Sequence, residues 1–253
     1  MASCSRGPST RAACAISAST SGTQEARSSI RTIPTKVLIG SKEATAGYES
    51  AAQNVTSGVA PVAVVTYKET ESLTVFIAGD AVFLRLWPYG YAVATGGEAA
   101  GSALKPEWVG VAHLPVVNEG DQGYATLGGW DFCINSFSDK KEQSWEFIQW
   151  MSQPKIQKMF AIDAGYIPGR KSLFEDKQLL KEQPVMELGR SSFESTRPRP
   201  SANPFYSDMS LDMAQAFTGT IKGDLEPEQA TRTLNNKLVR IASVAEQTFN
   251  LGG

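Results

Sequence analysis

The sequence contains few of the residues that carry metal and nucleophile chemistry. Its 253 residues include one histidine, His113, and three cysteines, Cys4, Cys14 and Cys133. A zinc centre or a histidine-assisted nucleophile needs several such residues together, and a disulfide scaffold needs cysteines in pairs. We therefore expect no metal site, no disulfide framework and no histidine-dependent catalysis, and no motif calls for a cofactor.

The chain also lacks an excess of charge and any long hydrophobic run. Twenty-four Lys and Arg residues stand against 26 Asp and Glu, which leaves a net charge of −2. Such a balance gives no basic surface for nucleic acid. No window approaches the roughly 18 apolar residues of a membrane span. We expect no nucleic-acid partner and no membrane-spanning helix.

The first 36 residues differ in composition from the rest of the chain. They are rich in Ser and Thr and carry a single acid, Glu25. Such a segment cannot bury enough apolar surface to fold by itself. Its longest apolar stretch, residues 12–16, is too short for the hydrophobic region of a secretory signal. We expect residues 1–36 to be a disordered tail outside the fold, with an organelle-targeting leader as the alternative.

From Val37 onwards, short β-branched runs alternate with amphipathic stretches, which is typical of an α/β protein. The apolar runs predict strands within residues 81–86, 109–117 and 124–135. Cys133 is therefore expected in the core. Apolar residues at helical spacing, together with Gly and Pro at the ends, predict helices over residues 43–56, 68–78, 138–152, 209–221 and 227–250, and another that starts at Pro154.

Aromatic residues are set among turn formers at two places. Residues 87–91 read Trp-Pro-Tyr-Gly-Tyr directly after an apolar run, and Gly128-Gly129-Trp130 interrupts another. Aromatic planes held in this way stack well on sugar rings, and a nearby arginine can bind ring hydroxyls. The alternative is that these aromatic side chains fill a core, and spacing alone does not decide between the two.

Five segments, taken in chain order, resemble the family 1 extracellular solute-binding proteins of ABC importers, and most closely the trehalose/maltose-type sugar binders. The likeness covers roughly residues 37–253. Its segments are residues 80–89, 127–134, 145–151, 165–170 and 199–207.

The resemblance implies a type II periplasmic-binding-protein-like α/β fold, whose two lobes close on a sugar and deliver it to the permease subunits of an ABC transporter. It implies a periplasmic or extracellular location and no catalytic residue. It places Trp87 and Tyr89 in the sugar cleft on one lobe, and Gly129 and Trp130 at the hinge side of the cleft. It also implies a basic residue that binds sugar hydroxyls, for which Arg199 is our choice and Arg197 the rival.

Members of this family are longer, and the part without a counterpart here is N-terminal. The likeness therefore implies a near-complete C-lobe, residues 37–126 and 171–253, with residues 127–170 forming the hinge and N-lobe helices. Sugar affinity is expected to be impaired because half of the cleft is missing. An exposed apolar patch is expected at Phe147, Ile148, Met151, Met159 and Phe160.

Two other classes of function remain open from the residues alone. A carbohydrate-active enzyme would need two carboxylates about 5 to 10 Å apart, for which Asp80, Glu119 and Asp131 are the candidates. A protein that reuses the lobe to bind a partner, without transport, is the second alternative.

Overall fold

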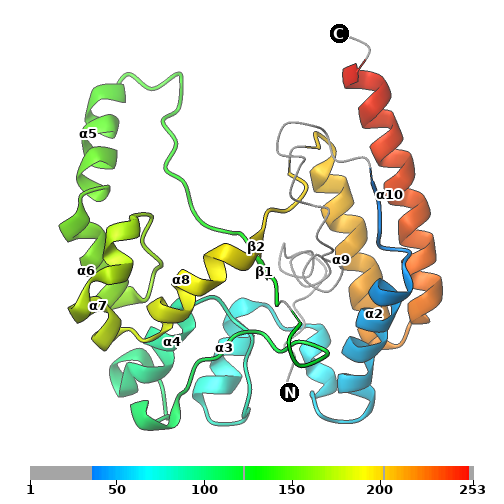
Figure 1. Ribbon diagram of the computed structural model, residues 1–253, viewed down its shortest axis with the longest axis horizontal. Coiled ribbons are helices and arrows are strands. Elements are labelled where there is room, and N and C mark those ends of the chain that lie inside the picture. Colours follow the sequence, from blue (N-terminus) through cyan, green and yellow to red (C-terminus); the bar gives the residue numbers. More distant parts are fainter. Residues whose placement is uncertain (1–35, 122, 202, 251–253) are drawn as a thin grey trace.

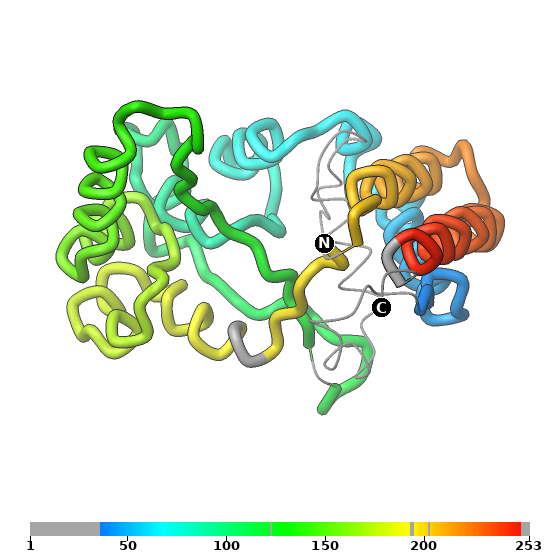
Figure 2. Tube along the Cα trace, turned by 90° about the horizontal axis from the view of Figure 1, so that it is seen from above, coloured from blue at the N-terminus to red at the C-terminus, as the bar shows by residue number. Residues whose placement is uncertain are grey.

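The computed structural model describes residues 36–121, 123–201 and 203–250, so the expected tail lies outside the described residues except for Lys36. Figures 1 and 2 show two groups of helices joined through extended segments that cross the middle of the molecule. All six helices expected from the sequence are present, with ends within a few residues of the expected positions.

The first group is a bundle of α2 (Lys42–Thr56), α9 (Tyr206–Lys222) and α10 (Pro227–Asn250). Helix α2 begins where the Ser41 hydroxyl accepts a hydrogen bond from the Ala44 amide, and α9 ends at Gly223 in the left-handed conformation. The rings of Tyr48 and Phe217 meet edge to face with centroids 5.3 Å apart. They are the largest side chains of a buried core that these helices share with the short 3₁₀ helix η2 (Val62–Val65).

The second group is a cluster of α6 (Pro154–Ala164), the 3₁₀ helix η5 (Lys171–Glu175), α7 (Lys177–Glu182) and α8 (Val185–Ser195). Asp176 caps α7 by accepting a hydrogen bond from the Leu179 amide at 2.9 Å. The Lys158 ammonium lies 2.8 Å from the other carboxylate oxygen and, together with the cap, holds the pKa of Asp176 below its usual value. The hydrophobic core of this cluster is formed by Ala161, Leu173, Leu179, Val185 and Met186.

Sheet structure among the described residues is limited to one parallel pair, β1 (Ala125–Thr126) with β2 (Thr196–Arg197). The prediction of strands at residues 81–86 and 109–117 is wrong, and within the strand predicted at 124–135 only β1 forms. These segments are extended, but a strand also needs a neighbouring backbone to pair with. The described chain supplies such a neighbour only at β2.

Residues 171–195 form η5, α7 and α8 and pack with α6. Consecutive helices joined by short loops usually pack together, which accounts for this grouping. The assignment of residues 37–126 and 171–253 to one lobe stays a prediction. After β1 the chain continues to α5 and the cluster, and after β2 it continues to α9 of the bundle (Figure 1).

Helices α3 (Glu69–Ile77) and α4 (Tyr89–Thr95) lie between the two groups, and α4 packs against both α3 and α6. Gly165, with a φ of +68°, ends α6 directly against α4. The Tyr89 Cα lies 3.1 Å from the point that a Cβ on Gly165 would occupy. The left-handed turn at a glycine thus lets α6 end close to the start of α4.

Helix α5 (Lys141–Met151) contains no buried residue. Within the expected apolar patch, Phe147, Met159 and Phe160 are exposed, whereas Ile148 and Met151 are half-buried. Cys133 was expected in the core and is exposed, because the segment that carries it is not part of a sheet.

Candidate functional site

Three segments that are far apart in the sequence meet at Trp87, Gly128 and Arg199. A Cβ added to Gly128 would lie 2.8 Å from Cη2 of Trp87 and 3.7 Å from Nη2 of Arg199. The indole therefore packs directly against bare backbone, with the guanidinium beside it. Only glycine leaves room for the ring in this position.

The crossing strands explain why these residues meet. In the parallel pair, Thr126 lies opposite Arg197, and the Leu127 amide continues the pairing by donating to the Arg197 carbonyl at 2.9 Å. Gly128 and Arg199 each follow two positions later, so they leave the pair at the same end. Trp87 reaches this point from the residues just before α4.

Tyr89, in the first turn of α4, forms a second part of the candidate site. Its hydroxyl donates a hydrogen bond to the Glu69 carboxylate at the start of α3. Its ring lies tilted against that of Tyr166, with centroids 6.3 Å apart. Glu69 and Tyr166 could not be selected from the sequence, because each reaches Tyr89 only through the packing of separate elements.

The two candidate arginines have different surroundings. Arg197 lies over the Tyr124 ring, 4.5 Å from its centroid, and donates to the Thr196 carbonyl. Arg199 lies beside Trp87 instead. The buried Nε of each arginine has no hydrogen-bond partner within the described part of the chain, so only the contact with Trp87 separates Arg199 from Arg197. A guanidinium in this position has donors available for an incoming polar ligand.

The other two expected site residues lie apart from this group. Trp130 is 96% exposed, and among the described residues no atom other than those of the adjoining residues lies within 4 Å of the point that a Cβ on Gly129 would occupy. The structure therefore brings Trp87 and Arg199 together, with Tyr89 two residues from Trp87, and leaves Trp130 in solvent. Gly128, next to the expected Gly129, is the glycine that Trp87 contacts.

The site offers an aromatic face, guanidinium donors and a phenol–carboxylate pair, which are the groups that recognise a polyhydroxylated ring. The three acids considered for hydrolysis, Asp80, Glu119 and Asp131, are all exposed. His113 lies 3.1 Å from the Ser191 hydroxyl, in an exposed contact.

No group of three or more His, Cys, Asp or Glu side chains suited to a metal ion occurs among the described residues. In the same part of the chain, no helix has the length and apolar character needed to cross a membrane.

The sequence profile of the family described as bacterial extracellular solute-binding protein matches residues 20–187. A probable ABC transporter-binding protein of Deinococcus radiodurans is 32% identical over 193 residues, which are 76% of this chain and 45% of the relative.

Two solved structures extend this similarity. Maltose-bound MalE3 of T. maritima has a TM-score of 0.76 and 29% identity, over 90% of this chain and 56% of that protein. A solute-binding protein of an ABC transporter from Agrobacterium radiobacter K84, in complex with ribitol, has a TM-score of 0.68 and 25% identity, over 81% of this chain and 51% of that protein. The fold is thus that of the α/β periplasmic binding proteins in partial form, and the chain spans about half the length of the relatives that it matches.

Proposed function

We propose, on the premise that the chain belongs to the bacterial extracellular solute-binding proteins, that it binds a di- or oligosaccharide as the substrate-binding component of an ABC transporter. Proteins of this family bind substrates and are not enzymes. The permease subunits of such a transporter are the macromolecular partners that this function requires, and the periplasm or cell exterior is the compartment in which it operates.

One observation carries the proposal of a sugar ligand. Trp87 packs on Gly128 with the Arg199 guanidinium at the edge of the contact, and the half-buried indole keeps part of its surface open. An indole face gives apolar contact to the C–H face of a pyranose, while the guanidinium donates to ring hydroxyls. We propose Tyr89, two residues from Trp87 and hydrogen-bonded to Glu69, as a further ligand-binding residue.

Trehalose and maltose are the ligands that we propose, the latter also because MalE3 of T. maritima was solved with maltose bound. We further propose that this chain binds them weakly. It spans about half of its relatives' length, and a ligand held from one side keeps part of its hydration and loses hydrogen-bond partners, each tenfold loss of affinity corresponding to about 1.4 kcal/mol.

Calorimetric titration of the full chain with trehalose and with maltose tests both proposals. We expect saturable binding weaker than the low-micromolar range, which W87A and R199A each abolish. W108A and R232A are matched controls, because Trp108 is 64% exposed with the Lys105 ammonium over its ring, and Arg232 is exposed on α10. Both controls should retain wild-type binding.

The two proposals fail in different ways. Low-micromolar binding by the unaltered chain would overturn the weak affinity and leave the sugar ligand standing. Equal losses in W87A and W108A, or no saturable binding of any sugar by the unaltered chain, would overturn the assignment of the site.

A further inference from the structure

Two arginines, Arg197 and Arg199, stand at alternate positions where the chain leaves the parallel pair. Side chains two residues apart on a strand project from the same face, with their Cα atoms roughly 7 Å apart. Each arginine also precedes a proline, Pro198 or Pro200, which favours an extended backbone in the residue before it. The sequence Arg-Pro-Arg-Pro therefore favours two guanidinium groups on one side of the chain.

Contacts with the neighbouring segment show that both arginines lie on one face of the pair. Tyr124, Thr126 and Gly128 are alternate positions of that segment, and Thr126 lies opposite Arg197. The Arg197 guanidinium lies 4.5 Å from the centroid of the Tyr124 ring. Nη2 of Arg199 lies 3.7 Å from the point that a Cβ on Gly128 would occupy. Both arginines thus reach side-chain positions of the same face.

An aromatic ring borders each guanidinium. Tyr124 lies under Arg197, and Trp87 packs on Gly128 beside Arg199. A guanidinium stacks on an aromatic plane and still donates hydrogen bonds from its edge. This face of the pair therefore combines two aromatic planes with two cations.

Neither guanidinium has an acidic partner in the described part of the chain. The ion pairs that the structure describes join lysines to aspartates and leave both arginines out. Both side chains are half-buried, and the buried Nε of each has no hydrogen-bond partner among the described residues. A partly buried cation without a counter-ion is destabilised by its lost hydration, and a bound anion compensates that cost.

We infer that the site takes an acidic sugar, whose carboxylate or phosphate group is bound by Arg197 and Arg199 together while its ring stacks on Trp87. A planar guanidinium matches either anion through parallel N–H donors. A neutral sugar offers the same donors only hydroxyl oxygens, which accept weaker hydrogen bonds than charged oxygens. The inference rests on the proposed sugar site and narrows its ligand to disaccharides that carry an anionic group.

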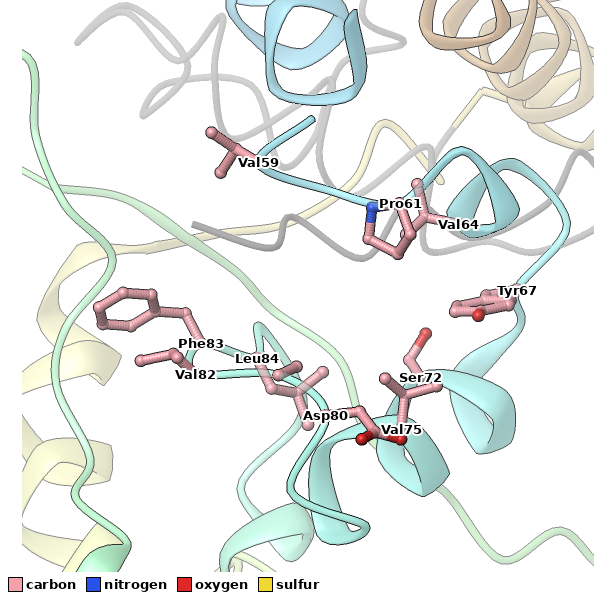
Figure 3. Close-up of a pocket in the computed structure, with 11 residues that line it drawn as sticks. Val59, Pro61, Val64, Tyr67, Ser72, Val75, Asp80, Val82, Phe83 and Leu84 are labelled. Atoms are coloured by element: carbon pink, nitrogen blue, oxygen red, sulfur yellow. The ribbon is translucent and has the colours of Figure 1, made fainter. Parts of the chain in front are cut away.

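A separate groove offers the opposite chemistry (Figure 3). Val59, Pro61 and Val64 form one apolar side of it, and the carboxylate of Asp80 is among its lining residues. None of the residues that line the groove is basic, and none belongs to the candidate sugar site. An anionic group would be repelled by Asp80 and attracted by the two arginines, which makes Asp80 a control position.

Calorimetric titration of the full chain with two matched pairs of sugars tests the inference. Maltobionate, which carries a carboxylate, is compared with neutral maltitol, and trehalose 6-phosphate is compared with trehalose. We expect at least one acidic sugar to bind more than about tenfold more tightly than its neutral counterpart. The pair that shows this preference identifies the anion as a carboxylate or a phosphate.

The dependence on salt provides a second measurement on the unaltered chain. Affinity for the preferred acidic sugar should fall as NaCl rises from about 0.05 M to about 0.5 M, because salt screens interactions between charges. Affinity for the neutral counterpart should stay constant. This measurement needs no substitution, so it tests the inference independently of whether a variant folds.

Three substitutions that each remove one charge locate the anionic group. R197Q should lower the ratio of acidic to neutral affinity by more than about fivefold, because one of the two cations is lost. R232Q, at an exposed arginine on α10, should leave the ratio unchanged. D80N should also leave it unchanged, whereas an acidic sugar that bound in the groove would bind D80N more tightly.

Failure of the inference is distinct from failure of the proposed function. Equal affinities within both sugar pairs would overturn the inference and leave the sugar site standing. A preference that does not depend on salt, an unchanged ratio in R197Q, equal falls in R197Q and R232Q, or a rise in D80N would also overturn it. No binding of any of the four sugars would overturn the proposed function and the inference with it.

Discussion

Two adjacent glycines, Gly128 and Gly129, occupy unlike surroundings. The Trp87 ring lies so close to Gly128 that a methyl group there would approach it to 2.8 Å, whereas the structure describes no packing neighbour within 4 Å of the equivalent point on Gly129. The contact is with the far end of a side chain, so the ring can move to relieve it. The position of the indole therefore depends on Gly128 more strongly than the free energy of unfolding does.

G128A should therefore displace the indole and weaken sugar binding by about tenfold while it lowers the unfolding free energy by less than about 1 kcal/mol. G129A should change neither. Calorimetric titration and chemical denaturation of both variants provide the measurement. If G128A and G129A bind sugar equally well, the packing of Trp87 on Gly128 has no part in ligand binding.

At the scale of the element, the end of α6 determines how two helices meet. Gly165 has a φ of +68°, and a Cβ there would lie 2.9 Å from the Ala92 Cβ and 3.1 Å from the Tyr89 Cα. Gly223 ends α9 with a φ of +85°, and in the described part of the chain no packing neighbour lies within 4 Å of the point that a Cβ would occupy. The two helix ends share one backbone conformation and differ in what surrounds it.

G223A should thus cost only the backbone strain, about 1–2 kcal/mol. G165A should cost the same strain plus about 1–3 kcal/mol because it forces α6 away from α4. Urea denaturation of the two variants measures the difference. Equal losses of unfolding free energy in G165A and G223A would mean that moving α6 away from α4 costs no free energy. The close approach at Gly165 would then contribute nothing to stability.

The helices could be predicted from the sequence because their signals are local. Ser41 before α2, Pro154 at the start of α6 and Gly223 after α9 act within one turn of the helix that they delimit. The strands could not, because residues 81–86 and 109–117 have suitable side chains but no partner strand among the described residues. Strand pairing depends on a second segment, so it cannot be predicted from the sequence of one segment alone.

The candidate site shows the same limit. The aromatic and arginine residue types pointed to sugar recognition, and family resemblance selected Trp87, Tyr89 and Arg199. Trp87 packs on Gly128, which lies 41 residues away in the sequence, and Tyr89 bonds Glu69, which lies 20 residues away. Both contacts depend on how separate segments fold together. No periodicity or spacing encodes such contacts.

At the scale of the whole molecule, the described residues form two separate buried cores. Leu234 of α10 lies in the bundle core, and Leu179 of α7 lies in the core of the α6–α8 cluster. The two cores share no buried residue. Each is therefore expected to unfold as its own cooperative unit.

L234A should lower the stability of the bundle by about 2–5 kcal/mol, and L179A should do the same for the α6–α8 cluster. Amide hydrogen exchange resolved by segment separates the two effects. Each substitution should speed exchange in its own unit and leave the other unchanged. Faster exchange in both units after either substitution would show that the molecule unfolds as one.

The parallel pair β1–β2 lies in the middle of the molecule between the two groups of helices, and Gly128 and Arg199 stand immediately beyond it. A ligand at Trp87 and Arg199 would therefore lie at the hinge between the cluster, which is joined to α5, and the bundle. A rotation of one group about this hinge displaces the atoms at the hinge very little and the far ends of the two groups most. A pair of spectroscopic labels at the exposed positions Gln149 on α5 and Glu246 on α10 would report such a rotation as a change in distance, even where the contacts around the ligand barely change.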